Sequence, residues 1–372
     1  MISGLGQGGA EESLRKLTIR TQRLGVEGLI VNLGTGGVLR PEFESAGARV
    51  EDLCISGIPT PRALFRLRRI AEQWRPDIIE GWMTHANVLA TMLGSVHSSA
   101  RVVWNVRASL LLSTEKLLTR TLTRSSTMLS RRADAIVYNS ARAAEQYRTI
   151  GYSPRVTHII PNGFDTQTFA GGVAQRREAR AKFALTDDAD VIGHISRWHP
   201  DKDLATLFDA FVRVRARHDA VLLVVAGEGL SEDNPDFMRE VEARGLRGSV
   251  RALGSVRPVS TLFPAFDAFA LTSLREGFPN VLGEALACGV QCVATDVGAC
   301  REVIGDASVY PVGDAAGVAE GLLQILAQSQ AQRDRRAQEG RARVESLFSI
   351  DELGRRYVAL YESVLSAPNG KR

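Results

Sequence analysis

The chain has 372 residues, of which 44% are hydrophobic and 24% are charged, and its formal net charge at pH 7 is +4. This length allows two domains of ordinary size, each with its own core. No apolar run reaches the ~18 residues that a membrane-spanning helix requires, and no signal peptide opens the sequence. A membrane-spanning or secreted protein is therefore not indicated, and a cytoplasmic one is expected.

The four cysteines lack the paired spacing of a zinc site. They are Cys54, Cys288, Cys292 and Cys300. Because cysteine is among the most often buried residue types, the three between 288 and 300 are predicted to be small apolar core residues rather than zinc ligands, and the usage of all four fits a reducing compartment better than a disulfide framework. No metal and no cofactor are expected.

Positive charge is concentrated in the first half of the chain. Residues 1–165 carry a net charge of +7 and residues 166–372 a net charge of −3. Much of the excess lies in two helical patterns, Arg62–Arg75 and Leu110–Arg132. Such a stretch can lie on an anionic membrane surface, or it can be a core-facing helix with a solvated basic face. Nucleic acid is not expected as a partner, because no aromatic residues interleave with these charges.

Apolar runs alternate with amphipathic segments from end to end, which predicts parallel α/β units. The strands expected in the first half are Gly28–Leu33, Val50–Ile55, Asp77–Gly81, Val102–Val106, Ala135–Asn139 and His158–Ile160. Those expected in the second half are Val191–Ile195, Val221–Ala226, Val250–Leu253, Phe266–Leu271 and Cys292–Thr295. The prediction is two doubly wound, Rossmann-like domains that face each other across a cleft.

The domain boundary is predicted near residues 161–183, where a Pro-Asn-Gly turn cluster precedes a polar, loosely structured stretch at Gln175–Arg180. The last helical pattern, Ile350–Leu365, has apolar positions that suggest docking rather than a free tail. We therefore expect a first domain of residues 1–163 plus 350–372 and a second domain of residues 164–349.

The chain opens with a glycine-rich loop in which Gly4, Gly6 and Gly9 match G-x-G-x-x-G. The dinucleotide-binding form of this motif needs an acid at the end of the second strand, and the sequence there is Val31-Asn32-Leu33. A nicotinamide cofactor is therefore not expected. The glycines are predicted to let backbone N–H groups approach a phosphate or a sugar.

Three residues, Met1, Ile2 and Ser3, precede this loop. Strands average about five or six residues, and the first strand of a doubly wound sheet is a central one. We expect that the natural start of the protein lies upstream of Met1.

Arg197 and Lys202 follow the first predicted strand of the second domain, in a strand-to-helix loop. Arginine can bind phosphate in a bidentate manner, and lysine acts as a point charge. The two residues would neutralise a diphosphate. The alternative is an ordinary surface loop with basic residues. The presence of the two-carboxylate segment Glu276–Glu284 in the same domain favours the phosphate site.

The most informative segment runs from Glu276 to Glu284, with Asn280 between them. Glu276 falls in the loop after a buried strand, and Glu284 falls on the first turns of a helix that begins after Asn280 and runs to Cys288. In a parallel sheet this crevice binds ligands, and the start of the helix favours a phosphate. Two carboxylates beside an anion site suit a nucleotide-sugar.

Together these pieces resemble the retaining group 1 glycosyltransferases of the GT-B fold, over nearly the whole chain. The resemblance rests on the opening loop and on six further segments: His85-Ala86-Asn87, Asn162–Asp165, Arg197 with Lys202, Leu253–Ser255, Glu276–Glu284 and Thr295–Gly298. It implies donor binding mainly by the second domain, a last helix that crosses back to the first domain, and a reaction that needs no metal.

The resemblance also implies a role for each matching residue. Glu276 would bind hydroxyls of the donor sugar, while Arg197 and Lys202 help the nucleoside diphosphate to depart. Glu284 would take the ribose hydroxyls. The remaining donor-binding positions would be Gly8, Gly9, Val256, Gly277, Phe278, Pro279, Asn280 and Val281.

The chain departs from the family at two positions in the first domain. Many members have histidine where this chain has Trp82 and Arg107, although His85 lies close by. Arg107 could bind a phosphate or carboxylate of donor or acceptor, or it could be a structural salt-bridge residue. Both interpretations of Arg107 stay open, and with His85 it completes the set of candidate catalytic residues.

The function expected is transfer of a sugar from a nucleotide, with UDP preferred, to a lipid-linked or polysaccharide acceptor in surface-glycan synthesis. A peripheral position at the inner face of the cell membrane is part of this expectation. The alternatives are a nucleotide-sugar epimerase of the same fold and a non-catalytic binding partner that keeps the fold.

Overall fold

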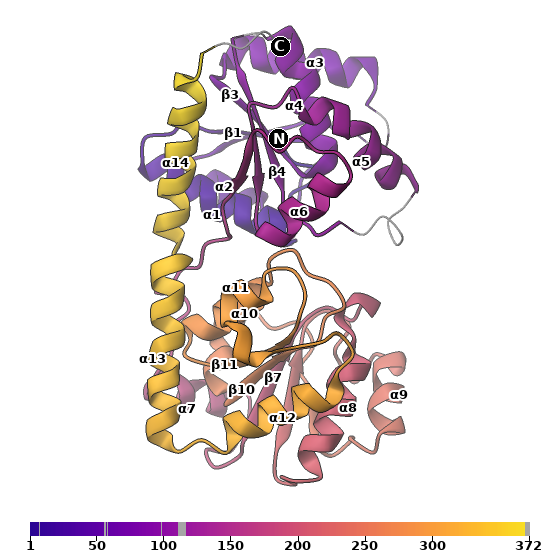
Figure 1. The fold of residues 1–372 in the computed structure, drawn as a ribbon, viewed down its shortest axis with the longest axis vertical. Helices are drawn as coiled ribbons and strands as arrows, with labels where there is room; N and C mark the ends of the chain where they lie inside the picture. Colours follow the sequence, from indigo (N-terminus) through magenta and orange to yellow (C-terminus); the bar gives the residue numbers. More distant parts are fainter. Residues whose placement is uncertain (7, 56, 58, 98, 111–116, 369–372) are drawn as a thin grey trace. The chain divides into compact units, whose positions relative to one another are not determined.

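The computed structural model describes residues 1–6, 8–55, 57, 59–97, 99–110 and 117–368. It divides the chain into two compact units, which are described separately. Unit 1 comprises Met1–Gly163 and the segment from Ile350 on, and unit 2 comprises Phe164–Ser349. Both are layered α/β units, so the predicted fold class is confirmed (Figure 1).

Unit 1 alternates short strands with helices. Its strands are β1 (Leu29–Asn32), β2 (Arg49–Asp52), β3 (Ile78–Trp82), β4 (Arg101–Val106), β5 (Ala135–Tyr138) and β6 (Thr157–Ile159). Its helices are α1 (Gly9–Arg23), α2 (Arg40–Ser45), α3 (Pro61–Trp74), α4 (Met83–Val96), α5 (Leu117–Ser130), α6 (Ala141–Thr149) and α14 (Ile350–Ser366). Helices α1, α2 and α14 contribute to the core on one face of the sheet, and α3, α4 and α6 to the core on the other face.

The sheet of unit 1 comes in two parts, β1-β2 and β3-β4-β5-β6, and every pairing in it is parallel. Isolated bridges from Ile2 to Asn32 and to Trp82 join the parts. The amide of Ile2 donates to Val31 O at 3.0 Å, and its carbonyl accepts from the amide of Leu33 at 2.8 Å. Ile2 thus takes the place of a central strand over a single residue.

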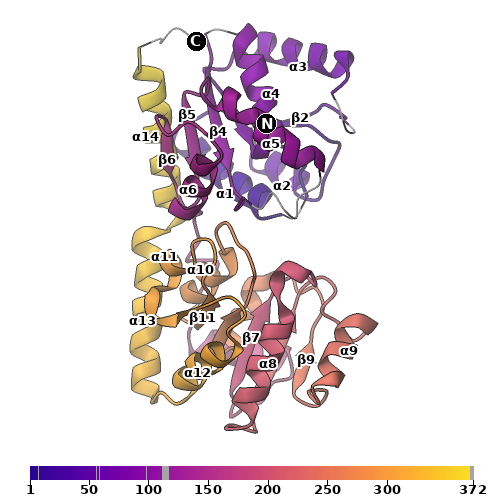
Figure 2. The same cartoon turned by 45° about the vertical axis from the view of Figure 1, so that its right-hand side comes forward.

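Unit 2 holds a continuous six-stranded sheet in the order β12-β11-β10-β7-β8-β9. Its strands are β7 (Val191–Ile195), β8 (Leu222–Ala226), β9 (Val250–Ala252), β10 (Ala268–Leu271), β11 (Gln291–Thr295) and β12 (Val309–Tyr310). Its helices are α7 (Val173–Lys182), α8 (Leu204–Arg215), α9 (Pro235–Ala243), α10 (Asn280–Ala287), α11 (Cys300–Ile304), α12 (Ala315–Leu326) and α13 (Gln330–Leu347). Figure 2 shows α8 and α12 lying over the sheet that contains β7.

Unit 2 buries side chains on both faces of its sheet. One core includes residues of α7, α10, α11 and α13, and the other includes residues of α8, α9 and α12. Strand β10 is buried at all four positions, which is why its sequence reads as a continuous apolar run rather than an alternating one.

The structure corrects some of the predicted elements. Gln175–Arg180, expected to be loosely structured, lies within α7. Asn280 is the first residue of α10 and follows its N-cap, Pro279. Strand β12 was not predicted, since two residues carry no readable pattern. The predicted helix Leu110–Arg132 begins in the structure at Leu117, and residues 111–116 lie outside the described part of the chain.

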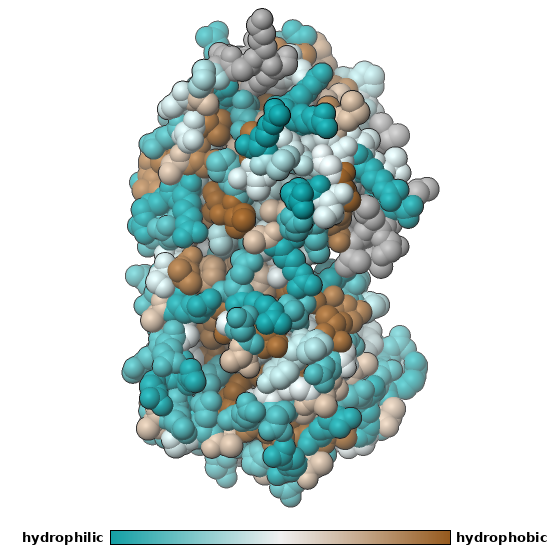
Figure 3. Space-filling view, viewed as in Figure 1, coloured by the Kyte–Doolittle hydropathy of each residue, from teal (hydrophilic) through white to brown (hydrophobic). Residues whose placement is uncertain are grey.

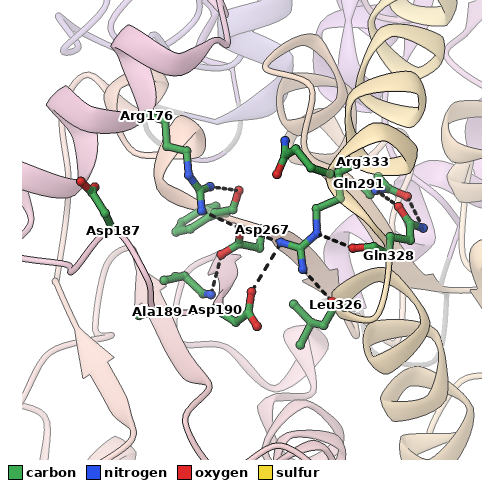
Figure 4. Close-up of polar contacts among 12 residues, drawn as sticks. Arg176, Asp187, Ala189, Asp190, Asp267, Gln291, Leu326, Gln328 and Arg333 are labelled. Carbon is green, nitrogen blue, oxygen red and sulfur yellow. Dashed lines mark hydrogen bonds and ion pairs between the residues drawn. The ribbon is translucent and has the colours of Figure 1, made fainter.

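A buried ionic network explains why α7 is ordered (Figure 4). Asp267, just before β10, accepts hydrogen bonds from Arg176 at 2.6 Å, from Arg180 at 2.8 Å and from the amide of Val191 at 2.8 Å. Arg333 of α13 approaches the same carboxylate at 3.3 Å. The Asp267 carboxylate therefore connects α7 and α13 to the amino ends of β7 and β10. In the sequence alone, the arginines that bind it resemble the polar residues of a loop.

The surface is mixed in character. In Figure 3, hydrophobic residues form separate patches among hydrophilic ones on the face drawn. Within the described residues, no helix is both long enough and apolar enough to cross a membrane.

Candidate functional site

Three loops of unit 2 meet at one edge of its sheet. They follow β7, β10 and β11, and β10 pairs in parallel with both of the other strands. The carboxyl ends of these strands therefore lie together, which is where parallel sheets bind ligands. The loops carry Arg197 and Lys202, then Glu276 to Pro279, and then Gly298.

Lys202 and Glu276 form the centre of this edge. Lys202 Nζ donates to Glu276 Oε1 at 2.6 Å, and the hydroxyl of Ser273 donates to the same oxygen at 2.7 Å. The Lys202 side chain is 20% exposed and that of Glu276 is 15% exposed. The pair is partly desolvated yet reachable from solvent, so a ligand can exchange with either partner.

A second set of contacts holds the two loops in register. Arg275 pairs with Asp201 at 2.5 Å, and the amide of Leu274 donates to Asp201 O at 2.8 Å. The hydroxyl of Thr272 donates to Asp203 O at 3.0 Å. These contacts fix the backbones on either side of Lys202 and Glu276. Sequence reasoning missed Ser273, Asp201 and Arg275, because partners so far apart in the chain leave no local pattern.

His194 lies buried beneath the site on β7. Its Nδ1 lies 2.9 Å from Ala270 O and its Nε2 lies 2.8 Å from Ser196 Oγ. Burial lowers the pKa of His194 to about 4, so the ring is neutral at pH 7. Since a carbonyl can only accept, Nδ1 carries the proton and Nε2 accepts from the hydroxyl of Ser196. The ring thereby fixes the first residue of the loop that carries Arg197.

The β11 loop reaches the site through a glycine. Gly298 has φ +51°, and a Cβ there would collide with the carbonyl oxygen of Glu276. The close approach lets the amide of Ala299 donate to Gly277 O at 3.2 Å. A side chain at position 298 would push this loop off the backbone of Glu276 and Gly277.

Helix α10 and the loop just before it supply the remaining predicted donor-binding residues. Phe278 packs inward, with its ring centroid 6.0 Å from that of Phe164, so it can offer a ligand its backbone alone. Val281 packs against the core, and Glu284 is 9% exposed. The first turn of α10, from Asn280 on, follows directly on the loop that carries Glu276, and the amide of Leu282 donates to Pro279 O at 3.1 Å.

Two predicted residues lie at the margins of this edge. Arg197 is exposed, and its guanidinium makes no hydrogen bond or ion pair with any described residue. Val256 is half-buried and packs against the core of unit 2. The exposed guanidinium of Arg197 is suited to bind a phosphate. The fixed apolar side chain of Val256 is suited to pack against a nucleotide base.

In unit 1, three predicted residues are accessible. Gly8 is the N-cap of α1, Gly9 is its first residue, and both are exposed. His85 is exposed on the first turn of α4.

Arg107 lies in a different setting, within the core of unit 1. Its Nη1 donates to Ile160 O at 2.9 Å and its Nη2 to the hydroxyl of Tyr357 at 2.5 Å. The guanidinium lies 4.8 Å from the ring centroid of Trp82. The side chain is 8% exposed. The partners are a carbonyl, a hydroxyl and a ring, and through them Arg107 connects β4 to α14.

The cysteines carry no metal cluster in the described part of the chain, where no three His, Cys, Asp or Glu residues come together as a metal site would require. Cys288, Cys292 and Cys300 are buried and Cys54 is exposed. Burial raises the pKa of Cys288 to about 12 and raises the pKa of Cys292 further. These three behave as small apolar core residues.

Comparisons with known proteins agree with this geometry. The profile described as Glycosyltransferase Family 4 matches residues 7–168, and the profile described as Glycosyl transferases group 1 matches residues 189–328. The chain belongs to the group 1 glycosyltransferases. The predicted membership in group 1 is thus confirmed, retention of configuration stays a prediction, and the two profiles fall largely one in each unit.

Two relatives illustrate the spread of this family. The chain is 30% identical over 201 residues to N-acetyl-alpha-D-glucosaminyl L-malate synthase of Bacillus anthracis, covering 52% of this chain and 51% of that protein. It is 29% identical over 252 residues to D-inositol 3-phosphate glycosyltransferase of Mycobacterium bovis, covering 64% of this chain and 51% of that protein. The matches thus span about half the length of these relatives.

Solved structures show the same fold. Anabaena Alr3699/HepE in complex with UDP is similar with a TM-score of 0.84 at 20% identity, covering 97% of this chain and 98% of that one. Sucrose-phosphate synthase from Thermosynechococcus elongatus is similar with a TM-score of 0.80 at 19% identity, covering 99% and 98%. The fold is GT-B.

Proposed function

We propose that this protein transfers a sugar from a UDP-linked donor to a lipid-linked or polysaccharide acceptor, with retention of the anomeric configuration and without a metal. The observation that carries the proposal is the pair formed by Lys202 and Glu276 at 2.6 Å, on loops at the carboxyl ends of neighbouring strands. The Lys202 ammonium is suited to the diphosphate of a nucleotide-sugar, and the Glu276 carboxylate is suited to the hydroxyls of its sugar.

Donor binding would exchange the partners of this pair. Hydroxyls of the sugar donate to Glu276, and the diphosphate takes Lys202, with Arg197 adding a second positive charge. Fixed positive groups stabilise the charge that develops on the departing diphosphate. The backbone from Gly277 to Asn280 and the start of α10 bind sugar and phosphate, Glu284 binds the ribose, and Val256 flanks the base.

The proposed reaction retains the anomeric configuration of the sugar because the new bond forms on the same face from which the diphosphate departs. In the proposed reaction the acceptor hydroxyl attacks from the face that the diphosphate leaves, through an oxocarbenium-like state. The departing phosphate takes the acceptor's proton. Glu276, held by Lys202 and Ser273, positions the sugar rather than bonding to it.

The structural neighbours lend support for the donor. The Anabaena Alr3699/HepE structures are complexes with UDP, with UDP and glucose, and with UDP-glucose. UDP as the carrier in this chain is proposed on that likeness of fold together with the cation and carboxylate described above.

For unit 1 we propose an acceptor-side role and contact with an anionic membrane surface. Residues 1–165 carry most of the excess positive charge, and large apolar side chains are exposed on three of its helices: Phe65 on α3, Met92 and Val96 on α4, and Met128 on α5. Helices α3 and α5 also carry arginines, whereas α4 carries no Lys or Arg, and exposed apolar residues on basic helices are typical of peripheral membrane surfaces. Flotation with anionic but not neutral vesicles is the expected result, and equal recovery with both would contradict this role.

The decisive test is calorimetric titration of the protein with UDP, GDP and ADP in the presence of EDTA. We expect micromolar binding of UDP, and weaker binding by more than about 1 kcal/mol in Lys202→Ala, the scale of a charge-assisted hydrogen bond. Equal affinity in the variant would move the diphosphate elsewhere.

Product analysis separates the remaining alternatives. Incubation with the UDP-sugar alone should leave it intact, whereas a new nucleotide-sugar would identify an epimerase. Failure of every diphosphate to bind would favour a non-catalytic partner. The anomeric configuration of the product, read by NMR, tests retention directly.

A further inference from the structure

The two ends of unit 2 lie side by side. The chain enters this unit at Phe164 and leaves it after Ser349. Phe164 forms an isolated parallel bridge with Ser349, and its amide donates to Phe348 O at 2.8 Å. The side chain of Phe164 is fully buried, and that of Phe348 is 6% exposed. We call Phe164 and Phe348 the paired ends.

Both paired ends contact the segment that carries the two carboxylates of the candidate site. We call Glu276–Glu284 the donor segment, and Phe278 lies within it. The centroid of the Phe278 ring lies 6.0 Å from that of Phe164, at an interplanar angle of 28°, and 5.7 Å from that of Phe348, at 67°. Because aromatic rings in contact prefer defined relative orientations, the paired ends fix the position of the Phe278 ring.

The ring of Phe164 also lies against α10. A Cβ on Gly283 would come within 2.2 Å of its Cε2 and Cζ atoms, so the ring rests on the backbone of the helix. Glu284, the proposed ribose-binding residue, comes next in the chain. One aromatic ring therefore contacts the donor segment on both sides of Asn280, where α10 begins.

Arg341 of α13 holds the other end of the same helix. Helix α13 lies beside α10 (Figure 2). Arg341 donates from Nη1 to Ala287 O, at the last residue of α10, and from Nη2 to Thr166 O, both at 2.8 Å. The first residues of unit 2 are thus connected to α10 through Phe164 and through Arg341.

The proposed reaction depends on precise placement of the donor segment. In that reaction the donor meets the segment at its backbone and at the carboxylates of Glu276 and Glu284. A misplacement of about 1 Å can lower a rate by about 10²-fold, and packed residues behind a site are what hold it to such precision. The paired ends are buried residues in contact with the segment but outside it, so they are placed to do this.

We propose that Phe164 and Phe348 are positioning residues for donor binding and sugar transfer. They act through Phe278 and Gly283, and they fix the backbone of the donor segment without touching the donor. This inference rests on the proposed function of the segment. A purely structural role, in which the two rings only add buried apolar area to the core, is the alternative that the experiment separates.

The experiment compares Phe164→Leu with Phe263→Leu. Phe263 is equally buried in the same core, and its ring packs against those of Phe169, Phe266 and Phe269. Both variants should lower Tm by a similar amount, because each removes a buried aromatic ring. Phe164→Leu should also weaken UDP binding about tenfold and lower kcat about 10–100-fold, whereas Phe263→Leu should change both by less than about twofold. Equal effects of the two variants on UDP affinity and kcat would overturn the proposal.

A double variant tests the route through Phe278. If Phe164 acts through this ring, the losses of UDP affinity in Phe164→Leu and Phe278→Leu should sum to clearly more than the loss in the double variant. Fully additive losses would contradict the route. Phe348→Leu repeats the comparison from the other paired end, and it replaces Phe164→Leu if that variant does not fold.

Hydrogen exchange separates this proposal from the proposed function. It reports local opening of the backbone without any ligand. In Phe164→Leu the amides of residues 277–286 should exchange at least about tenfold faster than in Phe263→Leu at equal loss of Tm. Equal exchange in this segment would overturn the positioning role even if UDP binds. Failure of the unaltered protein to bind any nucleoside diphosphate would instead contradict the proposed function.

Discussion

The two units build the same kind of sheet with different completeness. In unit 2, β7 lies inside a continuous ladder with β10 on one side and β8 on the other. In unit 1 the corresponding place between β1 and β3 is bridged by Ile2 alone among the described residues, and a cavity of about 730 Å³ lies beside it. The continuous sheet carries Lys202 and Glu276 on loops that follow two paired strands, β7 and β10.

The largest effect is expected at the pair itself. Glu276→Gln keeps the shape of the side chain but removes the charge that holds Lys202. We expect kcat to fall about 10²–10³-fold, the range seen when one fixed polar group of an active site is lost, while UDP affinity changes less than about twofold. Initial rates and calorimetry measure the two. Glu232→Gln, an exposed carboxylate of the same unit, is the control, and equal activity in both variants would remove Glu276 from the site.

The second effect is on the stability of unit 2 at low pH. His194 has a pKa of about 4 in the fold, below the ordinary histidine value of 6.5. The unfolded chain therefore takes up a proton at a higher pH than the folded chain does. The stability that neutral His194 contributes is complete above pH 6.5 and is lost as pH falls from 6.5 to 4, by about 3 kcal/mol in total.

Denaturant unfolding of His194→Gln measures this directly. The variant should be less stable at pH 7 and should show a shallower loss between pH 6.5 and 4 than the unaltered protein. Parallel curves for the two proteins would show that His194 does not contribute to the pH dependence.

The third effect compares the two sheets at equivalent depth. Ile192 of β7 is fully buried, and Ile2 is 1% exposed beside the cavity. Replacing a buried isoleucine by alanine costs about 2–5 kcal/mol, and the cost depends on how tightly the surrounding side chains pack against it. We expect Ile192→Ala near 4 kcal/mol and Ile2→Ala near 2 kcal/mol. Hydrogen exchange of β7 and of β1 amides reports each unit separately, and a larger loss in Ile2→Ala would reverse the comparison.

The smallest effect tests the residues that support the pair. Asp201→Asn removes the charge that binds Arg275 at 2.5 Å. Both side chains are about a quarter exposed, so we expect a loss of about 1 kcal/mol or less, seen as a fall in kcat of up to about fivefold with KM nearly unchanged. Asp236→Asn, which breaks an exposed pair with Arg239 on α9, is the matched control. A change in KM alone would make Asp201 a donor-binding residue instead.

The sequence by itself determined the alternation of strands and helices and the segment that carries function. Buried strands such as Val191–Ile195 and helices such as α14 show periodic apolar patterns, and these patterns depend on burial that neighbouring residues share. The spacing from Glu276 to Glu284 could be recognised because a loop and the helix after it are local structure. The short first strand could also be predicted, because Met1, Ile2 and Ser3 alone precede the glycine-rich loop in this sequence.

The tertiary structure alone decided which side chains meet. Three contacts join residues more than 70 positions apart in the chain: Lys202 with Glu276, Asp201 with Arg275, and Arg176 of α7 with Asp267. The sequence left Arg107 open as a ligand-binding or a structural residue, and in the fold it is buried against Trp82 and Tyr357. Such contacts arise from strand order and side-chain packing, which sum over the whole chain and leave no mark at any single position.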